Sequence, residues 1–274
     1  MKRGQDSMNI EFSKNIFQKR MTTMLKVDFR RMFTTPLFYI MLGISLVIPI
    51  LILVMTGMMD GTVTTDPQTG KETVMEGFNN VWQIIGSISG ADMAMGMTLT
   101  SMCNINMMFF LIAVFVCIFV CDDFRSGYAK NLFTVRSNKT DYVISKSVVG
   151  FVCGALMLVA FFIGAMIGGA VAGLPFDLGK ATAGGIVMSM LSKIFLVAIF
   201  VSIFLLASVF AKEKLWLAIL LSLAIGMLFY TMVPIITPLN ATFVNVILCL
   251  VGGAIFSFGI GYASKIVLNK IDLI

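Results

Sequence analysis

The sequence contains no histidine and few charged residues. Histidine is absent from all 274 positions, and Asp, Glu, Lys and Arg together make up only 12% of the chain, against roughly 25% in soluble domains. The absence of histidine excludes most zinc sites and the proton relays that depend on imidazole. The low charge content, beside 58% hydrophobic residues, predicts an integral membrane protein.

Catalytic and ion-coupling residues are also scarce. Intramembrane enzymes and proton- or sodium-coupled transporters need ionisable groups near the middle of the bilayer, and no Asp or Glu lies inside a predicted span. Lys193 is the single charge within an apolar run, and we expect its ammonium group to reach the membrane interface. Gly70-Lys71 is followed by Glu72 and lacks the upstream glycine of a phosphate-binding loop. We therefore predict no catalytic residue, no metal ligand and no ATPase site in this chain.

The five cysteines form no CxxC pair, and their number is odd. All lie within or at the edges of apolar runs, so we interpret them as small buried hydrophobic residues rather than disulfide partners or metal ligands. They are Cys103, Cys117, Cys121, Cys153 and Cys249.

Six apolar runs are long enough to cross a bilayer. We predict spans at about residues 36–58, 102–121, 147–173, 185–211, 215–233 and 244–263. Small residues recur at intervals of four in the third and sixth spans, which allows helices to approach closely: Gly164, Gly168, Gly169 and Gly173, then Gly253, Ser257 and Gly261. The predicted fold class is an all-α integral membrane protein with six transmembrane helices.

The basic residues are strongly biased to one side of this arrangement. Seventeen of the 20 Lys and Arg residues lie in residues 1–35, in the loops 121–146 and 212–214, or in the tail after residue 263. Because basic loops stay in the cytoplasm, we predict that both termini are cytoplasmic. The acidic loop 59–101 is then outside, with turns and a hairpin over residues 60–73. The charges flank apolar runs, so the net charge of +6 does not indicate a nucleic-acid partner.

The first 35 residues predict an amphipathic helix ahead of the first span. At about 100° per residue, one side carries the apolar residues Phe17, Met21, Met24, Leu25, Phe29 and Met32. The other side carries the basic residues Lys19, Arg20, Lys26, Arg30 and Arg31. Asp28 is the one charge inside the apolar arc. A basic amphipathic helix of this kind lies in the inner membrane interface.

The loop over residues 121–146 combines positive charge with apolar residues at helical spacing. Its basic residues are Arg125, Lys130, Arg136, Lys139 and Lys146, and its apolar ones are Phe124, Tyr128, Leu132 and Phe133. The spacing predicts a short helix with an apolar face, which needs a partner or the membrane surface to bury it. The alternative is an ordinary positive-inside loop whose charges only fix the orientation.

This loop resembles the corresponding segment of ABC-2 type exporter permeases. In that family an acidic residue stands four before a glycine, and a lysine, a short apolar patch, an arginine and a lysine opening the next span follow. Here those places are taken by Asp123, Gly127, Lys130, Leu132-Phe133, Arg136 and Lys146. Asp123 stands where glutamate is commoner, and Val135 replaces the proline that usually precedes the arginine.

The resemblance implies a short cytoplasmic coupling helix that docks on a separate ABC ATPase subunit, where ATP and Mg²⁺ bind. The coupling residues would be Asp123, Phe124, Arg125, Gly127, Lys130, Leu132, Phe133 and Arg136. It also implies that residues 1–35 are a connecting helix, with Phe17, Met21, Leu25 and Phe29 on its apolar side. Residues 36–274 would form the transmembrane domain.

The six-span layout and the large first outer loop fit the drug, lantibiotic-immunity and bacitracin-type members of this family. The resemblance then implies an exporter of an amphipathic or hydrophobic compound, such as an antimicrobial peptide or a drug. It would work in a bacterial plasma membrane, paired with a second permease copy or a related permease. Two alternatives stay open: a structural or assembly subunit of a membrane complex, and an ATP-independent secondary transporter. An intramembrane enzyme is the least supported class.

Overall fold

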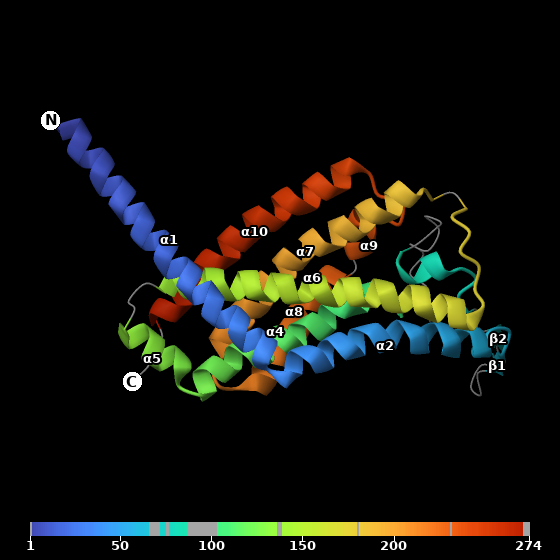
Figure 1. The fold of residues 1–274 in the computed structure, drawn as a ribbon. Helices are drawn as coiled ribbons and strands as arrows, with labels where there is room; N and C mark the ends of the chain where they lie inside the picture. Colours follow the sequence, from blue (N-terminus) through green and yellow to red (C-terminus); the bar gives the residue numbers. More distant parts are fainter. Residues whose placement is uncertain are drawn as a thin grey trace.

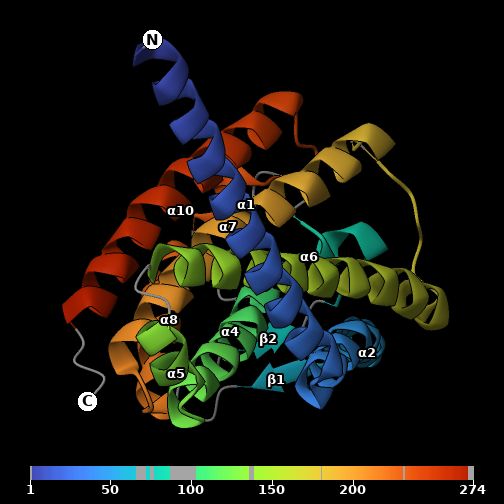
Figure 2. The same cartoon turned by 60° about the vertical axis from the view of Figure 1, so that its left-hand side comes forward.

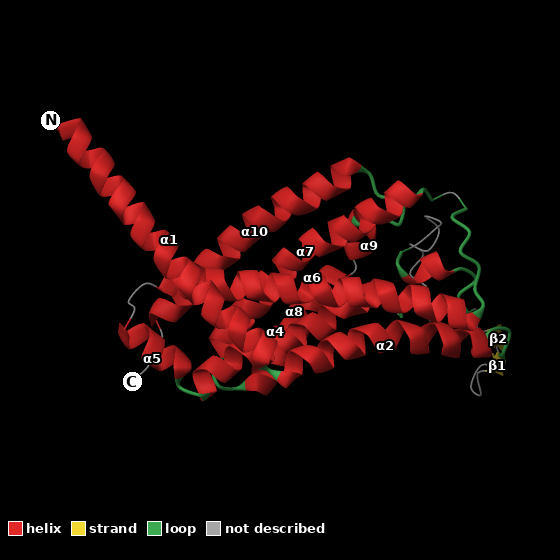
Figure 3. Ribbon diagram, in the orientation of Figure 1, coloured by secondary structure: helices red, strands yellow, loops and turns green. Residues whose placement is uncertain are grey.

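The computed structural model describes residues 2–65, 72–74, 77–86, 103–135, 139–179, 181–230 and 232–270. The long helices are α1 (Lys2–Thr34), α2 (Pro36–Met59), α4 (Met108–Arg125), α6 (Lys139–Ala172), α7 (Ala183–Ala211), α8 (Leu215–Tyr230) and α10 (Phe243–Lys270). The short elements are β1 (Val63–Thr65), β2 (Glu72–Val74), η1 (Val81–Ile84), η3 (Ile105–Met107), α5 (Tyr128–Val135) and α9 (Val233–Ile236). The predicted all-α class is confirmed (Figure 3).

Five of the described helices, α2, α4, α6, α7 and α10, are long and apolar enough to cross a membrane. The predicted fifth span corresponds to α8, which is apolar but has only 16 residues. At about 1.5 Å per residue it measures about 24 Å, less than the roughly 30 Å of a hydrocarbon core. It still packs against α4 and α7, and α9 continues the chain beyond it.

The long helices run side by side, with both termini and α5 at one end of the bundle (Figure 1). The two-stranded antiparallel hairpin of β1 and β2 lies at the opposite end, in the segment where the sequence predicts one. α4, α6 and α7 bury most of their residues, whereas α2 and α10 turn most of their surface outward. The core between α4 and α7 includes Phe109 stacked on Phe200, with ring centroids 4.3 Å apart.

α1 crosses the bundle at the α5 end and lies against α6 (Figure 2). Only Thr35 separates it from α2, whose first residue is Pro36. Proline suits this position because its missing N–H would have no helical partner there. The connection is therefore a sharp turn of a single residue, so α1 is tied directly to α2.

Two glycines of α6 allow it to approach α2 closely. A Cβ at Gly164 would overlap the carbonyl oxygen of Leu46, and one at Gly168 would lie 2.7 Å from Ile50 Cα. The predicted close helix approach is therefore confirmed at this pair. Gly173 has a different role: it adopts φ +69° directly after the last residue of α6, a left-handed position that glycine commonly fills where a helix ends.

Candidate functional site

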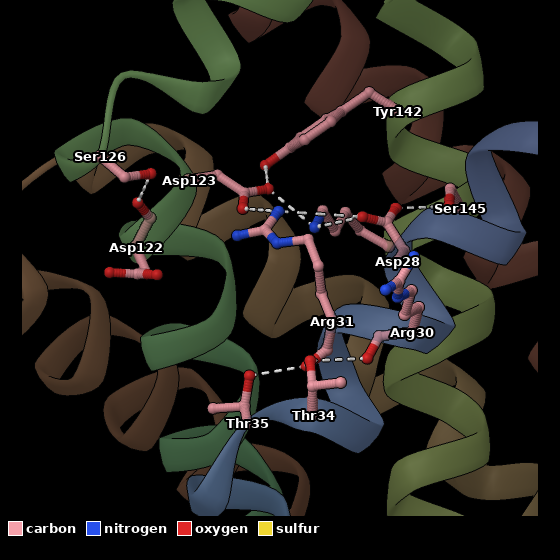
Figure 4. Close-up of polar contacts among 11 residues, drawn as sticks. Asp28, Arg30, Arg31, Thr34, Thr35, Asp122, Asp123, Ser126, Tyr142 and Ser145 are labelled. Atoms are coloured by element: carbon pink, nitrogen blue, oxygen red, sulfur yellow. Dashed lines mark hydrogen bonds and ion pairs between the residues drawn. The ribbon is translucent and has the colours of Figure 1, made fainter.

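Four charged side chains from three helices meet beneath α5. Asp28 and Arg31 come from α1, Asp123 from α4 and Lys146 from α6. The Lys146 ammonium group lies 2.9 Å from Asp28 Oδ1 and 2.8 Å from Asp123 Oδ2, while Arg31 Nη1 donates to Asp123 Oδ1 at 2.6 Å. The side chains of Asp28, Arg31 and Asp123 point toward one another (Figure 4). We call these four residues the charge cluster.

Neutral side chains complete the shell around the charge cluster. Ser145 donates its hydroxyl to Asp28 Oδ2 at 2.6 Å, and Tyr142 donates to Asp123 Oδ2 at 3.0 Å. The guanidinium of Arg31 lies 4.4 Å from the ring centroid of Tyr128, the first residue of α5. A cation over an aromatic ring is held by the ring's quadrupole. The start of α5 is therefore attached to α1 through Arg31.

The charge cluster is balanced in charge, and three of its four side chains are buried. Asp28 and Asp123 are 0% exposed, and Lys146 is 2% exposed. Buried charges are tolerated when they are paired and hydrogen-bonded, and here two carboxylates face two cations. Burial alone would lower the pKa of Arg31, but the carboxylates of Asp123 and Asp28 outweigh it and the pKa is raised. Arg31 therefore stays charged at any physiological pH.

The register of each helix explains how the cluster forms. On α6, Tyr142, Ser145 and Lys146 are spaced by three and four residues, so they share one face. On α1, Asp28 and Arg31 are spaced by three and face the same way.

Burial, followed by the nearby carboxylates, raises the pKa of Tyr128, which keeps its phenol neutral beside the cluster.

The apolar face of α5 is turned inward. Phe133 lies edge-on to Tyr142 with centroids 5.3 Å apart, and Leu132 is half-buried against the same core. Phe124, at the end of α4, is buried and also lies edge-on to Tyr142. The face that the sequence assigned to an outside partner or the membrane surface is thus partly covered by the chain's own helices, because the core of the bundle extends to the ends of α4 and α6.

Burial divides the predicted coupling residues into three groups. Asp123 and Phe124 are buried and offer no surface for docking. Arg125 and Lys130 are exposed, and the remaining described ones are half-buried: Gly127, Leu132 and Phe133. Arg136 lies outside the described residues.

The turn between α4 and α5 depends on Gly127. Its φ is +73°, and a Cβ there would meet nothing within 4 Å. Gly127→Ala is expected to lower the free energy of unfolding by about 1–2 kcal/mol from backbone strain alone. Gly127→Asn should cost less, because asparagine tolerates this conformation better. Thermal unfolding of both variants in detergent checks this, and equal stability of the Ala variant and the wild type would contradict it.

Comparison with known proteins identifies the chain. The model of a family described as "ABC-2 family transporter protein" matches residues 25–233, which include α2 to α8 and all four residues of the charge cluster. This chain belongs to the ABC-2 transporter family. No curated protein and no solved structure matches it. ABC-2 permeases are the membrane component of a transporter and work with an ABC ATPase subunit.

In this ABC-2 protein, α1 agrees only in part with the predicted connecting helix. Leu25 and Phe29 pack against the core and Met21 is half-buried, whereas Phe17 is 42% exposed. Arg31 was assigned to the polar side, which was wrong. It follows Asp28 by three residues and therefore lies on the same face, where its side chain is only 28% exposed.

Sequence reasoning did not identify the charge cluster as a unit, although its signals were present. Asp28 is the one charge in the apolar arc of α1, and Lys146 is the lysine that opens a predicted span. A lone acid on an apolar helix face and a lone base entering a span are both costly to bury without a partner. The presence of both predicts that Asp28 and Lys146 pair with each other. Nothing in the sequence pattern predicts that Tyr142 and Ser145 join them.

Lys193 corrects another prediction. It is 0% exposed and does not reach the interface. Its ammonium group donates to Asn106 Oδ1 at 3.0 Å and to Thr237 Oγ1 at 2.8 Å. It thereby joins α7 to η3 and to the end of α9. Among the Cys, Asp and Glu side chains of the described ranges, no group of three could hold a metal ion.

Proposed function

We propose that this permease exports an amphipathic or hydrophobic compound, such as an antimicrobial peptide or a drug, from the cytoplasm or the membrane. A separate ABC ATPase subunit would supply the energy, and α5 would receive its movement. The observation that carries the proposal is the charge cluster, because it connects α1, α4 and α6 directly beneath α5.

The mechanical argument follows from how strongly α5 is attached. Its apolar face packs on Tyr142 of α6, and Tyr128 lies under Arg31 of α1. A push on α5 therefore reaches α6 through packing and α1 through the cluster. The turn at Thr35 and Pro36 would transmit this motion from α1 to α2. In this proposal, ATP binding closes two ATPase subunits, and the helices rock between inward-open and outward-open arrangements around a pathway shared with a second permease.

The exposed side of α5 is the proposed docking surface. Lys130 extends from it beside the exposed Asn131, Thr134 and Val135, and Arg125, the last residue of α4, is exposed just before it. The two cations imply an acidic or helix-terminal counterpart on the ATPase. This end of the bundle also holds both termini (Figure 1), which supports a cytoplasmic location through the bias of basic residues.

Charge reversal at Lys130 of α5 and at Arg125, the last residue of α4, tests the docking surface. We expect Arg125→Glu combined with Lys130→Glu to reduce co-purification of the co-expressed ABC ATPase about tenfold, because like charges at an interface cost several kcal/mol. Lys270→Glu, which reverses an exposed lysine at the same end but outside α5, is the matched control and should leave the yield unchanged. Full co-purification of the α5 double variant would remove α5 as the dock.

A second measurement addresses export itself. Expression of the permease with its ATPase in a sensitive bacterial host should raise the minimum inhibitory concentration of an amphipathic antimicrobial peptide, and the α5 double variant should abolish the gain. If the permease protects equally well without an ATPase, a secondary transporter explains the data better. If the two proteins co-purify but no panel of amphipathic compounds is moved, the assembly-subunit alternative gains support.

A further inference from the structure

A groove between α6 and α10 lies apart from the charge cluster. It has a volume of about 420 Å³, within the roughly 300–1,000 Å³ usual for sites of small ligands. Its walls are apolar and come from both helices: Val143, Ile144 and Val148 on α6, then Ala254, Phe258 and Gly261 on α10. The charge bias predicts that the ends of α6 and α10 near this groove are cytoplasmic, which would place the groove in the inner half of the bilayer.

Two glycines and a serine on α10 shape the groove. Gly253 lies against Phe195 of α7, where a Cβ would be 3.0 Å from the carbonyl oxygen, and Ser257 hydrogen-bonds Ser202 of α7 at 3.0 Å. At Gly261 a Cβ would instead lie 3.5 Å from Val143 of α6. The middle of α10 therefore packs against α7, and its C-terminal part packs against α6. The groove is the space that remains between α6 and α10.

The cytoplasmic end of the groove carries a lysine. Lys265 lines it and is half-buried, and within the described ranges no carboxylate lies within ion-pair distance of its ammonium group. Lys139, at the start of α6, is already engaged: it donates to the Leu268 carbonyl at 2.5 Å and lies 5.6 Å from the Phe133 ring. The end of the groove is thus positive, while its length is apolar.

We infer that this groove binds one anionic phospholipid of the inner leaflet, with an acyl chain between α6 and α10 and the phosphate group on Lys265. Basic pockets between transmembrane helices on the cytoplasmic side favour anionic headgroups. The apolar walls match an acyl chain, and the ammonium group matches a phosphate. The inference does not depend on what the permease exports. A bound lipid here would fill the gap between α6 and α10.

Lipid binding to the purified full chain tests the inference. Palmitoyl-oleoyl phosphatidylglycerol and the corresponding phosphatidylcholine are titrated in detergent, and bound lipid is counted by native mass spectrometry. We expect the anionic lipid to bind about fivefold better, the contribution of one lysine near an anionic group. Lys265→Gln should abolish this preference, whereas Lys270→Gln, on the same helix but outside the groove, should retain it.

A steric variant separates the groove from general surface binding. Ala254→Phe fills the groove and should remove binding of both lipids, while Ile255→Phe, at the neighbouring exposed position outside the groove, should bind as the wild type does. Circular dichroism and size-exclusion profiles confirm that the variants are folded. Retained lipid preference in Lys265→Gln, or unchanged binding in Ala254→Phe, would overturn the inference. So would an amphipathic dye occupying the groove that phosphatidylglycerol fails to displace.

Discussion

Lys146→Met is expected to destabilise the chain by about 3–5 kcal/mol, the usual loss when one partner of a buried ion pair is removed. The substitution keeps the length and the apolar stem of the side chain but removes the ammonium group. Asp28 and Asp123, both 0% exposed, would then share only Arg31, whose Nη1 is 2.6 Å from Asp123 but 4.0 Å from Asp28. Asp28 would remain buried with little compensation.

A second substitution makes this prediction specific to charge. In the Lys146→Met background, Asp28→Asn restores neutrality and leaves the Arg31–Asp123 pair intact, so it should recover much of the lost stability. The measurement is the thermal unfolding midpoint of the monodisperse protein in detergent, followed by size-exclusion fluorescence. Lys130→Met, at an exposed lysine of α5, is the control and should change little. A double variant no more stable than Lys146→Met alone would refute a role based on charge balance.

Gly164→Ala is expected to have the second largest effect. The added methyl would overlap the Leu46 carbonyl oxygen and lie 2.8 Å from Pro49 Cγ, so α2 and α6 must separate. Overpacking of this kind costs about 1–3 kcal/mol and occasionally more. Because the nearest atom belongs to the backbone of α2, no change of rotamer can relieve the clash. We expect a lower unfolding midpoint and weaker function together, since in the proposed mechanism α2 receives the motion of α1.

The matched control for this prediction is Gly43→Ala on α2. A Cβ at Gly43 would meet nothing within 4 Å, and alanine favours a helix over glycine by about 1 kcal/mol. Gly43→Ala should therefore be neutral or slightly stabilising in the same unfolding assay. If both variants behave alike, the close approach of α2 and α6 is not a determinant of stability.

The sequence predicted the membrane class and the positions of the spans well, because hydropathy reports both directly. It predicted less well where α4 ends and α6 begins, at the α5 end of the bundle. α6 begins at Lys139 rather than near Ser147, and α4 continues to Arg125 rather than Cys121. Hydropathy ends a span at the first polar residues, but here those polar residues are buried and helical. Asp123 and Lys146 neutralise each other across the interface, so the helices continue through them.

The charge cluster could not be derived from local pattern for a related reason. Its basic members resemble topology signals, since Arg31 and Lys146 both flank apolar runs on the side rich in positive charge. Which base meets which acid depends on how three helices pack, and the Lys146–Asp28 contact joins residues 118 positions apart. The spacing of Gly164 and Gly168, by contrast, predicts close packing from the sequence, because small residues four positions apart lie on one face of a single helix.

The cluster also fixes an order of events during biosynthesis. Arg31 pairs with a residue 92 positions later, and Lys146 lies 23 positions beyond that partner. Asp28 therefore has no lysine partner until residue 146 of 274 has been synthesised. The full charge cluster, and with it the complete contact of α1 with the start of α6, can form only after half of the protein has been made.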